Sequence, residues 1–412
     1  MHIVAGLYIH IPFCEKKCIY CSFYSVETLD AKERFLRAIP HEIHMRADAL
    51  AQNGEAPAVY DTLFLGGGTP SLLSPEELAG ILGPLRERFA IAPDAEITME
   101  CNPGALTKEW LSGYRDLGVN RLSFGVQSFD DEELRFLSRI HTASEARESI
   151  GLAREFFQNV SLDLIFALPH QTRERWRANL LEGLRLGTGH FSAYSLIFEE
   201  GTRLNAMRLA GQVHPAPDGL EADMYEETMI TLAEHGFEQY EVSNYARPGR
   251  ECRHNLGYWE RRSYVAFGPS AHGFLRTGGA QTRWANISNL TAYCGAVESG
   301  TLPVAGVEEL TVPFIVDEIV FLGLRSSGVS LPELRAAAGI DLFEAAPAET
   351  ARLLDNGYAV LAGDRLKLTR KGYPFADRFA LQLLEAVERF VPDVMARPVA
   401  PPVLTILPQA AA

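Results

Sequence analysis

The sequence is organised around the stretch Cys14-Glu15-Lys16-Lys17-Cys18-Ile19-Tyr20-Cys21, which brings three thiols together at the spacing C-x₃-C-x₂-C. The residues before it, from Leu7 to Pro12, are mostly apolar, aromatic or β-branched and predict a short strand. Pro12 ends that strand because it has no N–H to donate to a neighbouring strand. The three thiols are therefore predicted to lie on a loop at the carboxyl end of the first strand.

Three thiolates on one short loop suit a soft metal site, because thiolates favour zinc, copper(I) and iron–sulfur clusters. A 4Fe-4S cluster held by three cysteines has one iron without a protein ligand, and that iron can hold a small molecule. The spacing alone leaves two alternatives open. One is a zinc site completed by His10, and the other is a redox pair formed by Cys18 and Cys21.

The composition is typical of a soluble globular protein. The chain has 412 residues, of which 47% are hydrophobic and 22% charged, with a net charge of −15. The negative charge argues against nucleic acid as a partner, since such a partner requires a basic face. No apolar run approaches the roughly 18 residues of a membrane span, and no signal peptide is evident. A cytoplasmic protein without a transmembrane segment is therefore expected, with Cys101, Cys252 and Cys294 as buried apolar residues.

Predicted strands alternate with predicted helices six times up to about residue 200, which indicates parallel βα units. Six units are too few for a closed eight-stranded barrel, so the sequence predicts an α/β fold built on a partial (βα)₆ barrel. The helix predicted over 30–52 has Asp30 as its N-cap and Pro40 as a point where it kinks or breaks. Polar and glycine-rich residues follow the strands, at the rim where such barrels carry their chemistry.

The rest of the chain departs from this alternation and divides the sequence into four predicted parts. Residues 236–310 are expected to be largely irregular, and residues 311–392 to form a smaller α+β C-terminal domain. The expected division is 1–235 for the barrel, 236–310 for the irregular segment, 311–392 for the C-terminal domain and 393–412 for a disordered tail.

The cysteine motif, with the aromatic Tyr20 before its third cysteine, resembles the motif of the radical S-adenosyl-L-methionine (SAM) enzymes. Longer strings resemble one branch of them, the oxygen-independent coproporphyrinogen III oxidases and their relatives. These strings are GGGTPSLL (66–73), ECNPG (100–104), NRLSFGVQSFDD (120–131), RIHT (139–142), DLIFALPHQT (163–172) and YEVSNYARPG (240–249). The resemblance implies a 4Fe-4S cluster on Cys14, Cys18 and Cys21, with SAM on the open iron.

The residue types at the predicted strand ends suit SAM. Gly67 and Gly68 allow its methionine end to approach the backbone closely. Glu100 can accept hydrogen bonds from the ribose diol, and Arg139 can pair with the carboxylate. The resemblance implies SAM contacts at Tyr8, Tyr20, Gly67, Gly68, Thr69, Glu100, Gln127, Arg139 and Asp163.

Two departures separate the chain from the true oxidases. Those enzymes carry a further cysteine two positions after the third, where this chain has Phe23, and a longer segment before the residue matching Tyr8. The string from His254 to Trp259, H-N-x-x-Y-W, resembles instead the marker of the HemW-type heme chaperones, in which the histidine is implied to hold heme. The residues by themselves also fit a core histidine among core aromatics, and Cys252 and His272 are further candidate heme ligands.

The resemblance thus implies a chaperone that binds heme, a 4Fe-4S cluster and SAM, and passes heme to an acceptor protein. Its alternative is a coproporphyrinogen III oxidase or another radical SAM oxidoreductase of porphyrin metabolism. Oxidation of coproporphyrinogen III is not expected. A reductant such as a flavodoxin or ferredoxin, and a homodimer, are compatible with the resemblance.

Overall fold

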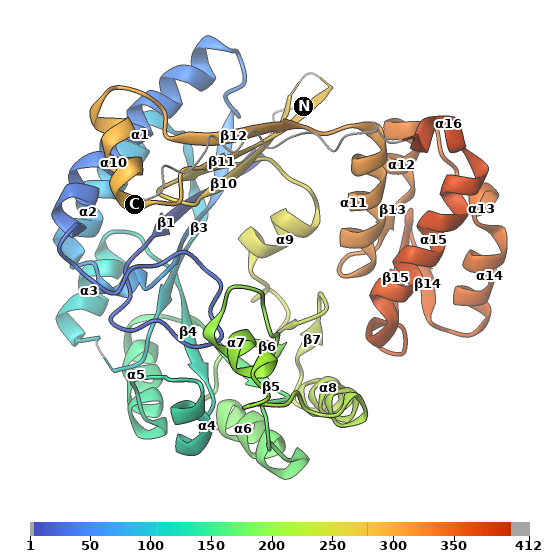
Figure 1. Cartoon of the computed structure of the whole chain (residues 1–412), viewed down its shortest axis with the longest axis horizontal. Coiled ribbons are helices and arrows are strands. Elements are labelled where there is room, and N and C mark those ends of the chain that lie inside the picture. The colour runs from blue at the N-terminus through green and yellow to red at the C-terminus, as the bar shows by residue number, and fades with distance from the viewer. Residues whose placement is uncertain (1–3, 105, 278, 397–412) are drawn as a thin grey trace.

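The computed structural model describes residues 4–104, 106–277 and 279–396. Strands and helices alternate through its first six strands, each neighbouring pair of which is parallel. The helices lie outside the sheet, as Figure 1 shows, so the predicted partial barrel is confirmed. The elements are β1 (Val4–Ile11), α1 (Lys32–Gln52), β2 (Val59–Gly67), α2 (Pro75–Arg88), β3 (Ile91–Cys101), α3 (Lys108–Asp116), β4 (Arg121–Gln127), α4 (Asp131–Phe136), α5 (Ala143–Phe156), β5 (Asn159–Phe166), α6 (Arg173–Arg185) and β6 (His190–Ser195).

Short-range signals explain where most of these helices begin. Ser74 accepts a hydrogen bond from the backbone N–H of Glu77, whose side chain accepts from the backbone N–H of Ser74 in return, so α2 starts with a capping box. Helix α1 differs from expectation, because its N-cap is Ala31 rather than Asp30 and it passes through Pro40 unbroken. Burial of the apolar face of α1 against the sheet offsets the free-energy cost of the hydrogen bond that the proline cannot donate.

Six further strands extend the sheet at both edges. Beyond β1 lie β9 (Tyr264–Phe267), β10 (His272–Thr277), β11 (Ala280–Asn286) and β12 (Val304–Glu309), and beyond β6 lie β8 (Asn244–Ala246) and β7 (Glu238–Gln239). Strand β9 is parallel to β1, whereas β8 is antiparallel to β6. The two ends of this twelve-stranded sheet, β12 and β7, do not pair with each other, so the barrel stays open.

The expectation of an irregular segment at 236–310 was therefore wrong. The segment supplies these six strands together with α9 (Arg253–Trp259) and α10 (Leu290–Glu298). Its strands are two to seven residues long and pair partly with strands far away in the sequence, which local periodicity does not detect. Two helices lie between the barrel's last parallel strand and this segment, α7 (Arg203–Leu209) and α8 (Asp218–Glu234). The domain boundaries themselves stay a prediction.

The C-terminal part has its own small sheet and core, as the sequence predicts. It comprises α11 (Val312–Leu324), β13 (Val329–Ser330), α12 (Leu331–Ala338), α13 (Leu342–Ala345), α14 (Pro347–Asp355), β14 (Ala359–Ala362), β15 (Arg365–Leu368), the 3₁₀ turn η2 (Tyr373–Phe375), α15 (Ala376–Phe390) and α16 (Pro392–Met395). The strand order is β13-β15-β14, and Val316, Leu366 and Leu383 are among its fully buried residues. Of the tail predicted to be disordered, 393–395 belong to α16, and the residues after 396 lie outside the described residues.

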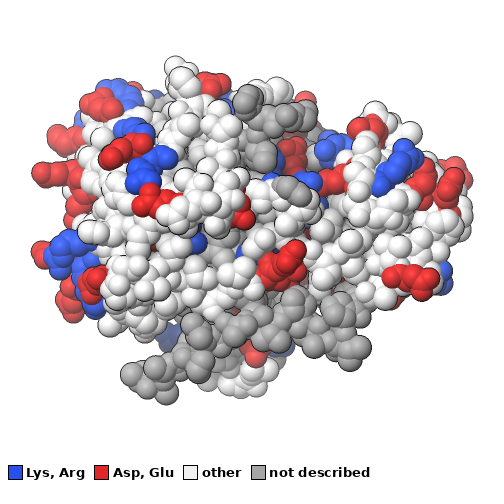
Figure 2. Space-filling model, turned by 90° about the horizontal axis from the view of Figure 1, so that it is seen from above, with Lys and Arg blue, Asp and Glu red and all other residues white. Residues whose placement is uncertain are grey.

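The C-terminal part is attached to the barrel by charged groups. The side chain of Arg261, which follows α9, is 2% exposed and forms ion pairs of 2.9 Å with both Glu318 and Glu333. On the outer surface, acidic and basic side chains lie side by side on the face that Figure 2 shows, so their charges offset each other locally. No helix within the described residues is both long and apolar enough to cross a bilayer.

Candidate cluster and cofactor site

The cysteine loop leaves the carboxyl end of β1 and is held by backbone hydrogen bonds. The N–H of Cys14 donates to the carbonyl of Val26 at 3.0 Å, and the N–H of Val26 donates to Pro12 at 2.7 Å. The thiols of Cys14, Cys18 and Cys21 are free and half-buried, and all three line one cavity of about 420 Å³. The structure thus brings the three predicted cluster ligands to one place.

The glycine turn after β2 forms backbone hydrogen bonds with the residues that lead into this loop. The N–H of Gly68 donates to the carbonyl of Ile11 at 2.8 Å, and the N–H of Thr69 donates to Phe13 at 2.7 Å. A Cβ atom on Gly68 would lie 2.6 Å from the carbonyl oxygen of Phe13, so only glycine fits there. Gly67 has a φ of 107°, in the region that favours glycine.

A chain of hydrogen bonds connects two of the three thiols. Thr69 Oγ1 donates to Cys14 Sγ at 3.6 Å and accepts from Asn102 Nδ2 at 2.9 Å. Arg139 completes the chain, with Nη2 donating to Asn102 Oδ1 at 2.7 Å and Nη1 to Cys18 Sγ at 3.3 Å. Asn102 was missed as a site residue in the sequence, although its position directly after β3 is the signal that singled out the others.

Arg139, which lines the cavity, also has one guanidinium N–H that is not engaged by the described residues. Its Nε is buried and has no hydrogen-bond partner within the described part of the chain. A buried unpaired guanidinium N–H is unfavourable until an acceptor reaches it. The side chain therefore fits the predicted role of pairing with an anionic group such as the methionine carboxylate of SAM.

Two half-buried carboxyl groups line the same cavity, with Glu100 near the end of β3 and Asp163 in the middle of β5. Burial, and then the neighbouring Asp163, raise the pKa of Glu100 to about 8, and burial raises the pKa of Asp163 as well. Glu100 accepts the N–H of Gly67 at 3.1 Å. A carboxyl group that keeps its proton near neutral pH can both donate to and accept from the hydroxyls of a ribose.

Most of the predicted site residues surround this one cavity. Gln127, at the end of β4, has a φ of 69°, a strained conformation of the kind found at functional sites. The predicted residues that line the cavity are Cys14, Cys18, Tyr20, Cys21, Gly67, Gly68, Thr69, Glu100, Gln127, Arg139 and Asp163.

Tyr8 is not among the residues that line the cavity. Its ring stacks on Phe64 with 6.3 Å between centroids, and its hydroxyl lies 3.2 Å from His10 Nδ1. The other nitrogen of His10, Nε2, lies 2.8 Å from the carbonyl oxygen of Tyr24, and burial lowers the pKa of His10 to about 4. Both ring nitrogens of His10 are thus engaged by protein groups. No group of three His, Cys, Asp or Glu side chains among the described residues meets around a single metal-ion position.

His254 does not line the cluster cavity, but it shares a smaller cavity of about 120 Å³ with Glu100 and Asp163, which do. It sits in α9, is 4% exposed, and packs against the first half of β2. Its Nδ1 is 2.8 Å from Thr62 Oγ1 and its Nε2 is 2.9 Å from the hydroxyl of Tyr258. Thr62 precedes Gly67 by five residues on β2, or about 16 Å along the strand.

The start of the motif is held by a buried carboxylate of the barrel. The N–H groups of Arg253 and His254 both donate to the buried Glu96 of β3 at 3.1 Å, which fixes the start of α9 inside the barrel. Burial, followed by Arg262 and Arg121, lowers the pKa of His254 to about 3, so the ring is neutral. A role of His254 as heme ligand stays a prediction.

The apolar side of the cavity was not predicted from the sequence. Tyr194, Leu196 and Ile197, at and after the end of β6, line it together with Phe23 and Ile165. Tyr194 and Ile197 are 43% and 63% exposed. Apolar residues after a strand end carry no distinctive pattern, but here they form a wall on which a flat ring can pack.

Comparisons with known proteins identify the family. The family model "Radical SAM superfamily" matches residues 8–182, and the "HemN C-terminal domain" model matches residues 314–375. The heme chaperone HemW of Mycobacterium tuberculosis strain H37Rv is 38% identical over 388 residues, which cover 92% of this chain and 94% of that protein. The chain belongs to the HemW family of radical SAM proteins.

Other relatives agree with this assignment. The heme chaperone HemW of Bacillus subtilis is 36% identical and covers 89% of this chain and 95% of its own length. The mitochondrial radical S-adenosyl methionine domain-containing protein 1 of Bos taurus is also 36% identical, over 93% of this chain and 88% of its own. The solved structure of the Escherichia coli coproporphyrinogen III oxidase HemN shares the fold, with a TM-score of 0.77 at 23% identity over 93% of this chain and 90% of that one.

Proposed function

We propose that this protein is a heme chaperone that binds heme, a 4Fe-4S cluster and SAM, and passes heme to an acceptor protein. The observation that carries the proposal is the match to heme chaperones over about nine-tenths of both chains. We place the protein in the cytoplasm. A flavodoxin or ferredoxin as reductant and a homodimeric state belong to the same proposal.

The three loop cysteines would hold the cluster, because they are free and share one cavity with the other predicted residues. When bound, such a cluster supplies an iron with an open coordination position and one-electron chemistry. The chain's own groups then act on SAM. Arg139 receives the carboxylate, Glu100 and Asp163 bind the ribose hydroxyls, and the glycine turn leaves room for the amino end.

Heme transfer gives the direct test. The full chain is reconstituted anaerobically with iron and sulfide, titrated with heme, and then mixed with a heme-free globin as a surrogate acceptor. We expect a Soret band on titration and its change to the spectrum of the heme-loaded globin on mixing. A reconstituted chain that binds no heme would contradict the proposal. So would a chain that binds heme but does not transfer it to the globin.

A further inference from the structure

Asn102 directly follows β3 and lines the cluster cavity, where its side chain has a partner at each end. One end faces Arg139 Nη2 at 2.7 Å, and because a guanidinium only donates, the atom there is the amide oxygen Oδ1. The NH₂ group at the other end therefore donates to Thr69 Oγ1, at 2.9 Å. The backbone N–H of Asn102 donates to Ser71 Oγ at 3.3 Å, which fixes the backbone at this point. Asn102 thus joins the glycine turn after β2 to the segment between α4 and α5.

The hydrogen bond from Asn102 decides where the hydroxyl proton of Thr69 can go. A hydroxyl has one proton to donate and accepts through its lone pairs. Because Thr69 Oγ1 already accepts from the amide, its proton is free for another acceptor, and Cys14 Sγ lies 3.6 Å away. Thr69 is 3% exposed, so water competes little for that proton. An acceptor in place of the NH₂ group would take the proton and leave Cys14 without this bond.

The other end of the amide orients the guanidinium of Arg139. Both protons of Nη2 are used, one by Asn102 Oδ1 and one by the carbonyl of Gly125, each at 2.7 Å. Since the guanidinium is planar, these two bonds also fix the directions of Nη1 and Nε. Nη1 then donates to Cys18 Sγ at 3.3 Å. Asn102 therefore acts on two of the predicted cluster ligands, on one through a neutral group and on the other through a cation.

We propose that Asn102 raises the reduction potential of the 4Fe-4S cluster by directing these two hydrogen bonds to the cysteine sulfurs. Asn102 is a positioning residue, because it acts through Thr69 and Arg139. The inference rests on the cluster assignment of the proposed function. It adds to that assignment a residue that sets how easily the cluster accepts an electron.

Hydrogen bonds to the ligand sulfurs favour the reduced form of such a cluster. Reduction brings in one electron, so the sulfurs become more negative and are better acceptors. Donors held against them therefore stabilise the reduced form more than the oxidised form and raise the potential. The bond from Arg139 is charge-assisted and the stronger of the two, whereas the bond from Thr69 is neutral and longer. A higher potential lets a milder reductant supply the electron.

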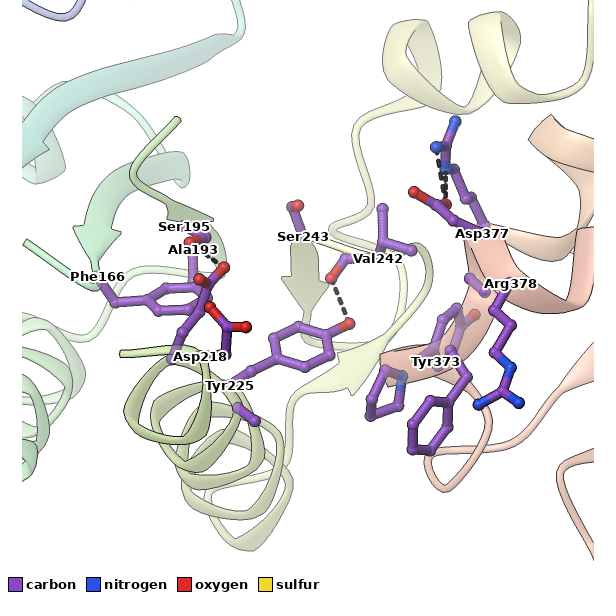
Figure 3. Close-up of a pocket in the computed structure, with 16 residues that line it drawn as sticks. Phe166, Ala193, Ser195, Asp218, Tyr225, Val242, Ser243, Tyr373, Asp377 and Arg378 are labelled. Carbon is purple, nitrogen blue, oxygen red and sulfur yellow. Dashed lines mark hydrogen bonds and ion pairs between the residues drawn. The ribbon is translucent and has the colours of Figure 1, made fainter. Parts of the chain in front are cut away.

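A neighbouring cavity offers a matched control. It has a volume of about 620 Å³, lies between the barrel and the C-terminal domain, and is lined by Tyr225 (Figure 3). The Tyr225 hydroxyl donates to the carbonyl of Val242 at 2.7 Å and accepts from Gln239 Nε2 at 2.9 Å. Tyr225 does not line the cluster cavity. Tyr225→Phe thus removes two half-buried hydrogen bonds without altering any bond to a cluster ligand.

The midpoint potential of the cluster in the full, anaerobically reconstituted chain tests the inference. It is measured by a redox titration followed by electron paramagnetic resonance. We expect Asn102→Ala to lower the equilibrium constant for one-electron reduction about tenfold, or ~59 mV, as the loss of a charge-assisted bond would. Tyr225→Phe should lower the melting temperature and leave the potential unchanged.

A second pair of variants separates the effect through Thr69 from a general loosening of the site. Asn102→Asp keeps the shape of the side chain and an acceptor for Arg139, but it offers Thr69 an oxygen in place of the NH₂ group. Thr69→Val should therefore lower the equilibrium constant for reduction about threefold in the wild-type chain and have no effect in the Asn102→Asp chain. The added charge of the aspartate is present in both members of the second comparison, so it cancels.

The outcomes separate this inference from the proposed function. A wild-type chain that takes up no iron and sulfide overturns the cluster assignment, and the inference with it. A wild-type chain that holds the cluster, with the same potential in Asn102→Ala or an equal shift in Tyr225→Phe, overturns the role of Asn102 alone. Equal effects of Thr69→Val in both backgrounds also overturn that role, and this comparison decides the matter if Asn102→Ala takes up no cluster.

Discussion

Replacing Gly68 by alanine should damage the cluster site. The new Cβ would lie 2.6 Å from the carbonyl oxygen of Phe13 and 2.9 Å from that of Ile11, so the cysteine loop would have to move by roughly 0.8 Å to reach ordinary contact. Overpacking of this kind costs about 1–3 kcal/mol. Weakening of the two backbone hydrogen bonds from Gly68 and Thr69 to the loop adds about 1 kcal/mol.

The expected result is a loss of about 2–4 kcal/mol of stability together with a cluster content well below that of the wild type. Iron and sulfide per chain after anaerobic reconstitution, and the melting temperature, measure both effects. Gly80→Ala is the matched control, because Gly80 lies in α2 with nothing within 4 Å of its added Cβ. That variant should be unchanged or slightly more stable. Wild-type cluster content in Gly68→Ala, with a melting temperature equal to that of the control, would refute the reasoning.

Four further predictions address the cluster, the chemistry and the buried groups. Changing any one loop cysteine to serine should abolish the broad iron–sulfur absorbance, whereas Cys101→Ser should not; retained iron and sulfide in the triple variant would contradict the assignment. Because Phe23 stands where the oxidases have a cysteine, an anaerobic assay with SAM and a reductant should show no conversion of coproporphyrinogen III above a no-protein control. With its pKa raised from 4.5 to about 8, Glu100 keeps a proton in the folded chain that the unfolded chain releases, so stability should fall as pH rises through that window. Glu100→Gln should flatten the fall in melting temperature between pH 5 and 8, measured on the chain without added cluster, and an unaltered slope would show that other groups cause it. His254→Ala should cost about 2 kcal/mol through unpaired buried partners, while the exposed His214→Ala should leave the melting temperature unchanged.

The six parallel βα units could be predicted from the sequence because the residues that indicate them act locally. Strand runs, capping residues such as Ser74, and glycine or polar residues after strands all act within a few positions of where they stand. The residues predicted at those strand ends line most of the cavity, because parallel strands bring their carboxyl ends to the same edge of a sheet. This reasoning missed two residues that line the cavity, Asn102 and Tyr194. An amide in a turn and an aromatic residue at a strand end are both common in proteins without any function.

The parts that were not predicted depend on contacts between distant segments. Strand β9 forms only because β1 offers it a free edge, and no periodicity within its four residues reveals that partner. His254 was expected on an irregular segment because its neighbours showed no regular pattern. Its burial follows from Glu96 and Thr62, which lie on other strands of the barrel and which nothing near His254 in the sequence indicates.

The cysteine loop is held by protein groups throughout, through Val26, the glycine turn and the Thr69-Asn102-Arg139 chain. Proteins such as zinc fingers fold only when their metal arrives. Because these contacts are made within the polypeptide, we expect the chain to fold before iron and sulfide are delivered. Oxidative loss of the cluster should accordingly leave a folded protein that can be refilled, so that a damaged molecule is repaired by reinserting iron and sulfide rather than replaced by new synthesis.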